Sequence, residues 1–431
     1  MRRNTFQIDY KNCSVRIYRK TEAFCDVSSL GINKNECKDG AGIGGSKSLH
    51  SRHKGVHYST PASDAITRKQ KTVAITKALQ CDPVDVTSLR QLAISRGGLI
   101  TDELRYLAWP KLVNVNIYNI PPKPKASVLE AHRDYNQVVL DVNRSLKRFP
   151  PGMKDDQRTV LQKQLVDMIM RVLVRHKELH YYQGYHDICV SFLLVMNDDI
   201  AFYIMDKLST NHLRDFMDSS MDRTKCMLNY LYPIIGKANP VLKEFLDRSE
   251  TGTIFCLPWL ITWYGHVLND FRHTVRLYDF FLACHPLMPI YLAAAIVLYR
   301  QDEVLQADCD MPSVHSLLSK IPPDLPFEDL ISRAGDLYVQ YPPKQLANEA
   351  RLQYKHSTTI SSYMNFEETT QSQRPDTILK QLRSLNISEP SVDGTESESS
   401  RLVKVSVYVL ATAVSAAAFA VLNTAADWGW F

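Results

Sequence analysis

Three short patterns in this chain combine side chains that could engage a charged or polar partner. They are Arg105-x-x-x-Trp109, Val138-x-x-Asp141-x-x-Arg144 and Tyr181-x-Gln183-Gly184. Arginine carries a planar, permanently charged group with several hydrogen-bond donors, and a glutamine amide can both donate and accept. Each pattern alone is a weak signal, so its meaning depends on the elements that position it.

Arg105 and Trp109 are four residues apart, which places them on one face of a helix. Such a pair normally belongs to the contact between a helix and a core tryptophan. We therefore expect these two residues to have a structural role rather than a catalytic one.

The second pattern lies on a helix that is expected to be amphipathic. Its predicted apolar stripe consists of Tyr135, Val139, Val142 and Leu146. At about 100° per residue, Arg144 falls roughly opposite this stripe and is expected to face solvent or a partner. Asp141, one turn back on the flank of the helix, could hold the guanidinium in a set orientation. The alternative is a solvated ion pair, worth about a few tenths of a kcal/mol.

Gln183 lies in a polar and aromatic run, residues 180–187, directly ahead of the apolar run 188–196. Gly184 permits a backbone turn that would leave the Gln183 amide projecting from the chain. The alternative is a buried amide whose hydrogen bonds are satisfied at the start of a helix.

The elements that must position these patterns are predicted to be helices. From about Val73 the apolar residues follow a helical period for some 270 residues, and alternating strand-like runs are scarce. Residues 155–176 show the period clearly, with one face formed by Leu161, Leu165, Ile169 and Val172. Gly97 and Gly98 are expected to end one helix, and Thr101 and Asp102 to cap the next. The predicted fold class is all-α, with one large multi-helix domain.

The order and spacing of the three patterns resemble those of the TBC-domain GTPase-activating proteins for Rab GTPases. The signatures R-x-x-x-W, I-x-x-D-x-x-R and Y-x-Q-G of that family match them, with Val138 in place of isoleucine. Trp259, Arg276 and Asp279 also fit the later helices of the family. The resemblance covers about residues 90–345, and it implies an all-α fold that accelerates GTP hydrolysis by a Rab GTPase in vesicle traffic.

The resemblance also implies a role for each patterned residue. Arg144 would act as an arginine finger, and Gln183 would orient the attacking water. The supporting residues would be Asp141, Tyr181, Gly184, Arg105 and Trp109, of which the last two would be scaffold or Rab-contact residues. No cofactor, metal or small-molecule substrate is expected for this chain, because GTP and magnesium would be carried by the partner Rab.

The chain is expected to divide into five parts. They are a disordered segment (1–66), the TBC domain (67–345), a polar linker (346–401), a transmembrane anchor (402–425) and a short lumenal tail (426–431). Residues 405–422 contain no charge, and eighteen helical residues span roughly 27 Å, near the hydrocarbon thickness of a thin bilayer. A buried core helix is the alternative for this stretch.

The residues that flank the predicted anchor set its orientation. Arg401 and Lys404 precede it, and Trp428 and Trp430 follow it. Basic residues favour the cytosolic side, and tryptophans suit the opposite interface. We expect a single-pass protein of the endoplasmic reticulum membrane, or of the early Golgi, with its catalytic domain in the cytosol. The resemblance then implies the Rab of ER-to-Golgi transport as the partner.

Charge and cysteine usage argue against several other classes. Residues 1–66 carry 11 Lys/Arg and 6 Asp/Glu of the 51 and 46 in the chain, so residues 67–431 carry 40 of each. A nucleic-acid binder should concentrate basic charge on its folded surface, so this class is disfavoured. The nine cysteines form no C-x-x-C pair, which favours a reducing, cytosolic location.

Two further alternatives concern the chemistry itself. His186, Asp187 and Cys189 are close in sequence, as in a thiol hydrolase, but adjacency is not the spatial triad that such chemistry needs. A non-enzymatic, membrane-anchored helical adaptor that binds Rab or other traffic proteins is the main competing hypothesis. Retention of both Arg144 and Gln183 favours the GTPase activator, because an adaptor could lose either residue without unfolding.

Overall fold

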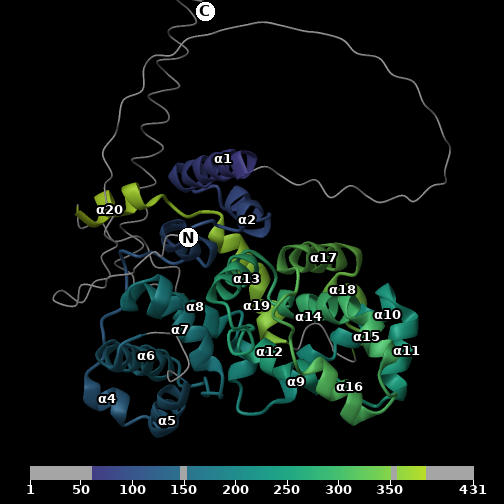
Figure 1. Cartoon of the computed structure of the whole chain (residues 1–431). Helices are drawn as coiled ribbons and strands as arrows, with labels where there is room; N and C mark the ends of the chain where they lie inside the picture. The colour runs from purple at the N-terminus through teal and green to yellow at the C-terminus, as the bar shows by residue number, and fades with distance from the viewer. Residues whose placement is uncertain (1–60, 146–152, 351–356, 385–431) are drawn as a thin grey trace, which may run out of the picture. The chain divides into compact units, whose positions relative to one another are not determined.

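Helices make up every regular element that the computed structural model describes, over residues 61–145, 153–350 and 357–384 (Figure 1). These ranges contain no strand, which confirms the all-α expectation. The chain divides into two units, residues 1–380 and 381–431. All contacts described below lie within the first unit.

The first helices build the part of the domain that carries the three patterns. They are α1 (Pro61–Gln80), α2 (Val86–Ile94), α3 (Asp102–Leu112), α4 (Ala126–Glu130), α5 (Tyr135–Ser145), α6 (Asp155–Arg175), α7 (Tyr185–Val195) and α8 (Asp198–Thr210). Thr101 caps α3 as expected, because its side chain accepts a hydrogen bond from the Leu104 amide at 3.4 Å. Helix α6 packs against α4, α5, α7 and α8. Its predicted stripe is buried along the whole helix, at Leu161, Leu165, Ile169 and Val172.

The remaining elements complete the core and the C-terminal part of the domain. They are η2 (Arg214–Met217), α9 (Asp222–Leu228), α10 (Leu231–Ala238), α11 (Pro240–Arg248), η3 (Ile254–Cys256), α12 (Leu257–Ile261), α13 (Phe271–Ala283), α14 (Met288–Tyr299), α15 (Gln301–Gln306), α16 (Met311–Leu318), α17 (Phe327–Gln340), α18 (Pro343–Leu346), α19 (Thr358–Thr370) and α20 (Asp376–Ser384). Helix α14 has no charged residue and is buried from Met288 to Leu298. It packs against α10, α12 and α17, as a helix that is apolar on every side must.

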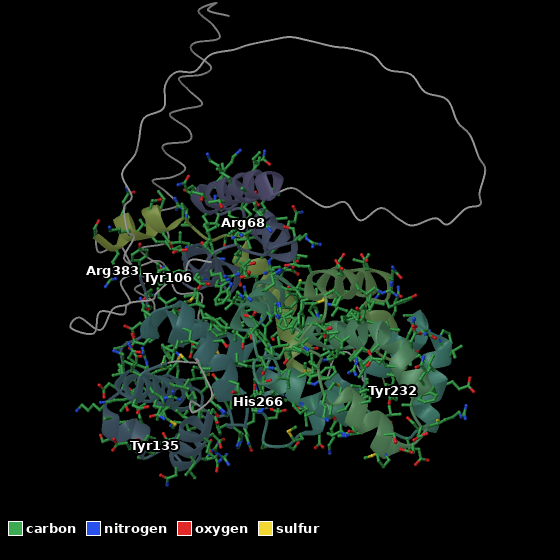
Figure 2. All side chains as sticks on the ribbon, in the orientation of Figure 1. Arg68, Tyr106, Tyr135, Tyr232, His266 and Arg383 are labelled. Carbon is green, nitrogen blue, oxygen red and sulfur yellow. The ribbon has the colours of Figure 1, made fainter. Side chains whose placement is uncertain are left out.

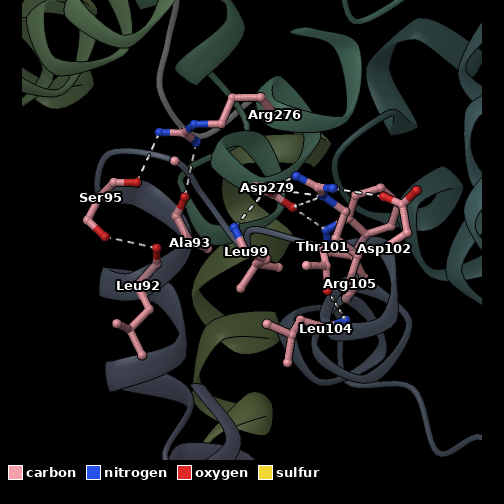
Figure 3. Close-up of polar contacts among 12 residues, drawn as sticks. Leu92, Ala93, Ser95, Leu99, Thr101, Asp102, Leu104, Arg105, Arg276 and Asp279 are labelled. Carbon is pink, nitrogen blue, oxygen red and sulfur yellow. Dashed lines mark hydrogen bonds and ion pairs between the residues drawn. The ribbon is translucent and has the colours of Figure 1, made fainter. Parts of the chain in front are cut away.

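The first pattern belongs to a buried ionic cluster around Asp279 of α13 (Figure 3). The Asp279 side chain is fully buried and accepts hydrogen bonds from Arg105 Nε at 3.0 Å, Arg105 Nη2 at 2.9 Å, Trp109 Nε1 at 2.8 Å and the Leu99 amide at 2.9 Å. These donors compensate the desolvation of the carboxylate. A Cβ at Gly98 would collide with Asp279 Oδ2, so glycine is required there.

Arg276, one turn earlier on α13, ties the end of α2 to the same helix (Figure 3). Its guanidinium donates to the carbonyl oxygens of Ala93, Ile94 and Ser95 at 3.0 to 3.1 Å. It also pairs with Glu328 of α17 at 2.8 Å. These carbonyls lie at the C-terminal end of α2, where helical hydrogen-bond partners run out and a cation is favoured.

The predicted polar linker, 346–401, is wrong for part of its length because α19 packs into the domain core. Ile360, Tyr363 and Phe366 are buried on one face of α19. Arg90 of α2 donates to the Tyr363 hydroxyl at 2.9 Å. The Thr359 hydroxyl accepts from the amide of the buried Asp215 at 3.1 Å. The sequence did not predict that this helix is part of the core, because its three apolar side chains at i, i+3 and i+6 form only a narrow stripe among polar neighbours.

The residues after α19 continue this attachment. Lys111 of α3, 1% exposed, donates to the Arg374 carbonyl at 3.1 Å and pairs with Asp376 at 2.8 Å. The Val84 amide donates to the Gln373 carbonyl at 2.8 Å. The folded domain therefore begins at α1 and continues through these contacts, beyond the predicted limits of 67 and 345.

The other predicted parts of the chain lie wholly or mostly outside the described residues. Of the segment 1–66, only residues 61–66 are described, and they belong to α1. Across the three described ranges, no helix combines the length and the apolar character that crossing a bilayer requires. The anchor predicted at 402–425 and the tail at 426–431 fall outside those ranges.

The Asp279 cluster predicts a large loss of stability when its charge is removed. We expect Asp279→Asn to lower the free energy of unfolding by about 3 kcal/mol, because the buried Arg105 would lose its compensating charge. The matched control is Asp329→Asn, which removes an exposed carboxylate 3.6 Å from Arg96 and should cost less than about 1 kcal/mol. Urea denaturation measures the free energy of unfolding of both variants. Equal losses would show that the buried contacts of Asp279 do not stabilise the fold more than an exposed ion pair does.

Two buried histidines predict a loss of stability in mild acid. Burial lowers the pKa of His212 to about 3 and the pKa of His285 to about 4. Both contact the aromatic ring of Tyr363. In the unfolded chain these histidines bind protons as the pH falls below about 6.5, whereas the folded chain does not bind them until near pH 4. The stability they contribute is therefore complete above pH 6.5 and falls as the pH is lowered.

The size of this effect follows from the same linkage. Each histidine should remove about 2 kcal/mol from the free energy of unfolding between pH 7.5 and pH 5. We expect His212→Phe to remove about half of this pH dependence in denaturation curves. If the free energy of unfolding of that variant depends on pH as steeply as in the wild type, folding does not lower the pKa of His212.

Candidate functional site

A groove of about 700 Å³ brings the second and third patterns together. Its walls come from the end of α5, the start of α7, helix α12 and the segment that joins α12 to α13, which includes His266 (Figure 2). Residues of the two patterns that line it are Asp141, Arg144, Gln183 and Gly184. Segments some 40 residues apart in the chain thus meet at one site.

Arg144 lies in the last turn of α5 with 64% of its side chain exposed. This agrees with the expected outward orientation. Its Nη2 donates to Asp141 Oδ1, so the carboxylate holds the guanidinium as the sequence suggested. The C-terminal end of a helix also favours a positive charge. Arg144 is therefore both oriented and accessible from the groove.

The predicted apolar stripe of α5 is wrong in its details. The buried face is formed by Val138, Asp141 and Val142, whereas Val139 is only half-buried. Leu146 lies outside the described residues. The helix is rotated relative to the prediction because its inner face must pack on both α6 and α7. Asp141, expected on the flank, is instead 1% exposed.

Asp141 is stable in this buried position because donors converge on both of its carboxylate oxygens. Besides Arg144, it accepts from Gln137 Nε2 at 3.0 Å and from the Tyr181 hydroxyl at 3.0 Å. Burial and the nearby Asp141 carboxylate raise the pKa of Tyr181 well above its usual value, so the hydroxyl keeps its proton. Tyr181 therefore connects the third pattern to the helix that carries Arg144.

Gln183 and Gly184 adopt the turn that the sequence suggested. Gly184 has φ +110° and caps the N-terminus of α7, a conformation that favours glycine. A Cβ at this position would also lie 3.0 Å from Thr262 Cγ2. Gln183 is exposed on the groove wall, and within the described ranges no residue hydrogen-bonds its side chain. Its amide is thus available to a partner.

Arg105 and Trp109 do not line the groove. They are buried, with 7% and 0% of their surface exposed, and both donate to Asp279. Burial opposes the charged form of Arg105, but the Asp279 carboxylate outweighs it and raises the pKa of the guanidinium. Both side chains therefore lie inside the domain, bonded to Asp279 and away from the groove.

Ser145 and His186 also line the groove, although the sequence did not predict them as site residues. The Ser145 hydroxyl lies 2.6 Å from His186 Nε2, and the Tyr181 hydroxyl lies 2.8 Å from His186 Nδ1. The available signal was the spacing of Ser145, four residues after Asp141, and the position of His186 in the polar run before α7. Neither the spacing of Ser145 nor the position of His186 in the chain shows that the two side chains are in contact.

The structure also argues against the thiol hydrolase. Cys189 is fully buried, and this burial raises the pKa of its thiol well above the usual range. A protonated, enclosed thiol is not a nucleophile. Among the described residues, no cluster of three or more His, Cys, Asp or Glu side chains is placed to hold a metal ion.

Comparisons with known proteins agree with this architecture. The family model for the Rab-GTPase-TBC domain matches residues 102–305. The Homo sapiens and Mus musculus proteins named TBC1 domain family member 20 are each 56% identical over 365 residues, which cover 84% of this chain and 91% of theirs. The GTPase-activating protein gyp10 of Schizosaccharomyces pombe is 30% identical over 253 residues, 57% of this chain and 67% of its own.

A solved structure supports the fold independently. The crystal structure of the Ypt/Rab-GAP domain of Gyp1p aligns with a TM-score of 0.52 at 14% identity, covering 63% of this chain and 98% of that domain. At this identity the likeness concerns the fold alone. The family is shown by the two relatives that are 56% identical over 91% of their length, in agreement with the family model: the chain belongs to the Rab-GTPase-TBC domain family of Rab GTPase-activating proteins.

Proposed function

We propose that this protein accelerates GTP hydrolysis on a Rab GTPase by inserting Arg144 and Gln183 into the active site of its partner. The observation that carries the proposal is that both side chains are exposed on the wall of one groove. GTP and magnesium are carried by the Rab, so the chain itself contributes only donors, acceptors and charge. No cofactor of its own takes part.

Arg144 supplies the positive charge that the reaction needs. Hydrolysis spreads negative charge over the transferred phosphoryl group, and an arginine supplied in trans contributes about 10³ to 10⁵ in rate. Asp141 engages one side of the guanidinium through Nη2, which leaves other donors of the planar fork for phosphate oxygens. A preset orientation adds to the effect because the group needs no reorganisation during the reaction.

Gln183 orients the attacking water. An amide can accept a hydrogen bond from water and donate another to a phosphoryl oxygen or a partner backbone group. The Gly184 turn presents this amide at the N-terminal end of α7, on the same groove as Arg144. The two residues therefore have different roles: Arg144 stabilises the negative charge on the phosphoryl group, and Gln183 positions the attacking water.

The cellular setting proposed here rests on the sequence of the C-terminal stretch. The uncharged run 405–422 would span roughly 27 Å as a helix, which matches the thin bilayer of the endoplasmic reticulum. Arg401 and Lys404, which precede this run, favour a cytosolic orientation of the domain. We assign the protein to that membrane, with the early Golgi as a further site, and its substrate to the Rab of ER-to-Golgi transport. Tethering both partners to one surface raises their effective concentration.

The catalytic proposal is tested by single-turnover GTP hydrolysis with the full chain in detergent micelles and a panel of GTP-loaded Rabs. For a Rab that the wild type accelerates, Arg144→Ala should lower the rate by about 10³-fold or more. Arg144→Lys should not restore it, since an ammonium lacks the planar fork. Gln183→Ala should lower the rate by at least about tenfold, because the water loses its orientation.

The matched control for Arg144 is Arg96→Ala. Arg96 is also an exposed arginine next to a carboxylate, Asp329, but it does not line the groove. Its replacement should leave the stimulated rate unchanged. If no Rab responds to the wild type, or if Arg144→Ala retains full activity, the two-residue mechanism is wrong and an adaptor role becomes the better explanation.

The anchor proposal is tested by deleting residues 402–431. In solution, the truncated protein should stimulate a soluble Rab as well as the full chain does in micelles. On liposomes that carry a prenylated Rab, it should be at least about tenfold less effective, because the shared surface no longer concentrates the partners. An unrelated membrane span fused after residue 401 should restore activity there. Equal potency of the truncated and full-length proteins on liposomes would refute the anchor.

A further inference from the structure

His186 closes a ring of hydrogen bonds between α5 and the turn that presents Gln183. On one side, the Tyr181 hydroxyl lies 2.8 Å from His186 Nδ1 and donates to Asp141 Oδ2 at 3.0 Å. On the other side, the Ser145 hydroxyl lies 2.6 Å from His186 Nε2 and 2.8 Å from the Asp141 carbonyl oxygen. The ring therefore returns to Asp141, the residue that holds Arg144.

The direction of each hydrogen bond in this ring can be deduced. Tyr181 has one hydroxyl proton, and it donates that proton to Asp141, so His186 Nδ1–H donates to the tyrosine oxygen. In a neutral imidazole with its proton on Nδ1, Nε2 can only accept, so the single Ser145 hydroxyl proton is shared between Nε2 at 2.6 Å and the Asp141 carbonyl oxygen at 2.8 Å. Burial lowers the pKa of His186 even though the carboxylates of Asp187 and Asp141 oppose this, which is consistent with the neutral form.

The charged and titratable groups around the imidazole come from three elements. Asp187, on the same helix, has Oδ2 3.6 Å from His186 Nε2. His266, from the segment before α13, lies 3.3 Å from that same oxygen. Asp141 and Arg144 face it from α5. His186 itself is 4% exposed, so its ring nitrogens are held by protein groups rather than by bulk solvent.

We propose that His186 is a positioning residue that fixes Arg144 and Gln183 relative to each other; this inference rests on the function proposed above. Gln183 lies in the chain between Tyr181 and His186, and both of these residues are bonded to α5 or to each other. The ring thus pins the two ends of the segment that carries Gln183 to the helix that carries Arg144. A displacement of about 1 Å in such groups can cost a factor of about 10² in rate.

The rest of α7 is anchored without this ring, which separates a positioning role from a structural one. The hydroxyl of Tyr185 is bonded to Ser209 at 2.6 Å, and Ile188 and Phe192 are fully buried. Helix α7 also packs on α6 and α8. Loss of the His186 contacts should therefore leave the domain folded, while Arg144 and Gln183 are no longer held in a fixed position relative to each other.

The test is steady-state stimulation of a responsive Rab by the full chain in detergent micelles, with kcat and KM for Rab·GTP measured separately. His186→Phe keeps an aromatic ring but removes both ring nitrogens. We expect it to lower kcat by at least about tenfold with KM changed less than about twofold. His186→Asn retains a donor near the position of Nδ1 and should recover part of this loss.

A double-mutant comparison checks that His186 acts through Arg144. In an Arg144→Ala background, His186→Phe should lower kcat by less than about twofold, because residues that act as a unit are not additive. Fully independent losses would overturn the inference. Ser145→Ala breaks the ring on its half-buried side and should lower kcat by about threefold. Wild-type kcat in both Ser145→Ala and His186→Asn, with His186→Phe unfolded, would overturn it too.

The matched control is His176→Phe. His176 also bonds a carboxylate through Nε2, at 2.7 Å from Asp206, but it lies at the end of α6 and does not line the groove. Its replacement should leave kcat unchanged. Full activity in Arg144→Ala would overturn the proposed function and this inference together. Loss of activity in Arg144→Ala with wild-type kcat in a folded His186→Phe protein would overturn this inference alone.

Discussion

A buried carboxylate is tolerated only where several donors converge on it, and this constraint organises the domain. Asp279, Asp215 and Asp141 are each at most 1% exposed. The Asp279 carboxylate accepts from α3 and from the loop before it. The Asp215 carboxylate accepts from the Ser357 hydroxyl and the Thr359 amide at the start of α19, and the Asp141 carboxylate accepts from Tyr181. Each of these contacts joins segments at least 40 residues apart in the chain. The three aspartates therefore connect parts of the domain that are distant in the sequence.

The same arrangement has a structural role at Asp279 and Asp215 and, in the mechanism proposed above, a catalytic role at Asp141. At Asp279 the arginine partner is also buried, and each of its three guanidinium nitrogens is bonded to Asp279 or Asp102. At Asp141 the arginine partner is 64% exposed and lines the groove. The difference follows from position, because Asp279 lies within a helix packed on α2 and α3, whereas Arg144 lies in the last turn of α5.

Local patterns predicted the helices and the exposure of Arg144, because both follow from spacing along one element. The orientation of α5 was not predictable to within one residue, since packing on two other helices decides which face is buried. The membership of α19 in the core depends on Arg90 and Asp215, far away in sequence. His186 and Ser145 were missed as site residues for the same reason. Their hydrogen bonds form only when α5 and α7 come together.

The hold of Asp141 on Arg144 also changes the thermodynamics of the encounter with a partner. A free arginine side chain carries about 2 kcal/mol of rotamer entropy. Here part of that entropy is already lost when the domain folds, because the guanidinium is bonded in the unliganded protein. If Arg144 is inserted into a partner, as proposed above, complex formation therefore loses less side-chain entropy than it would with an unrestrained arginine.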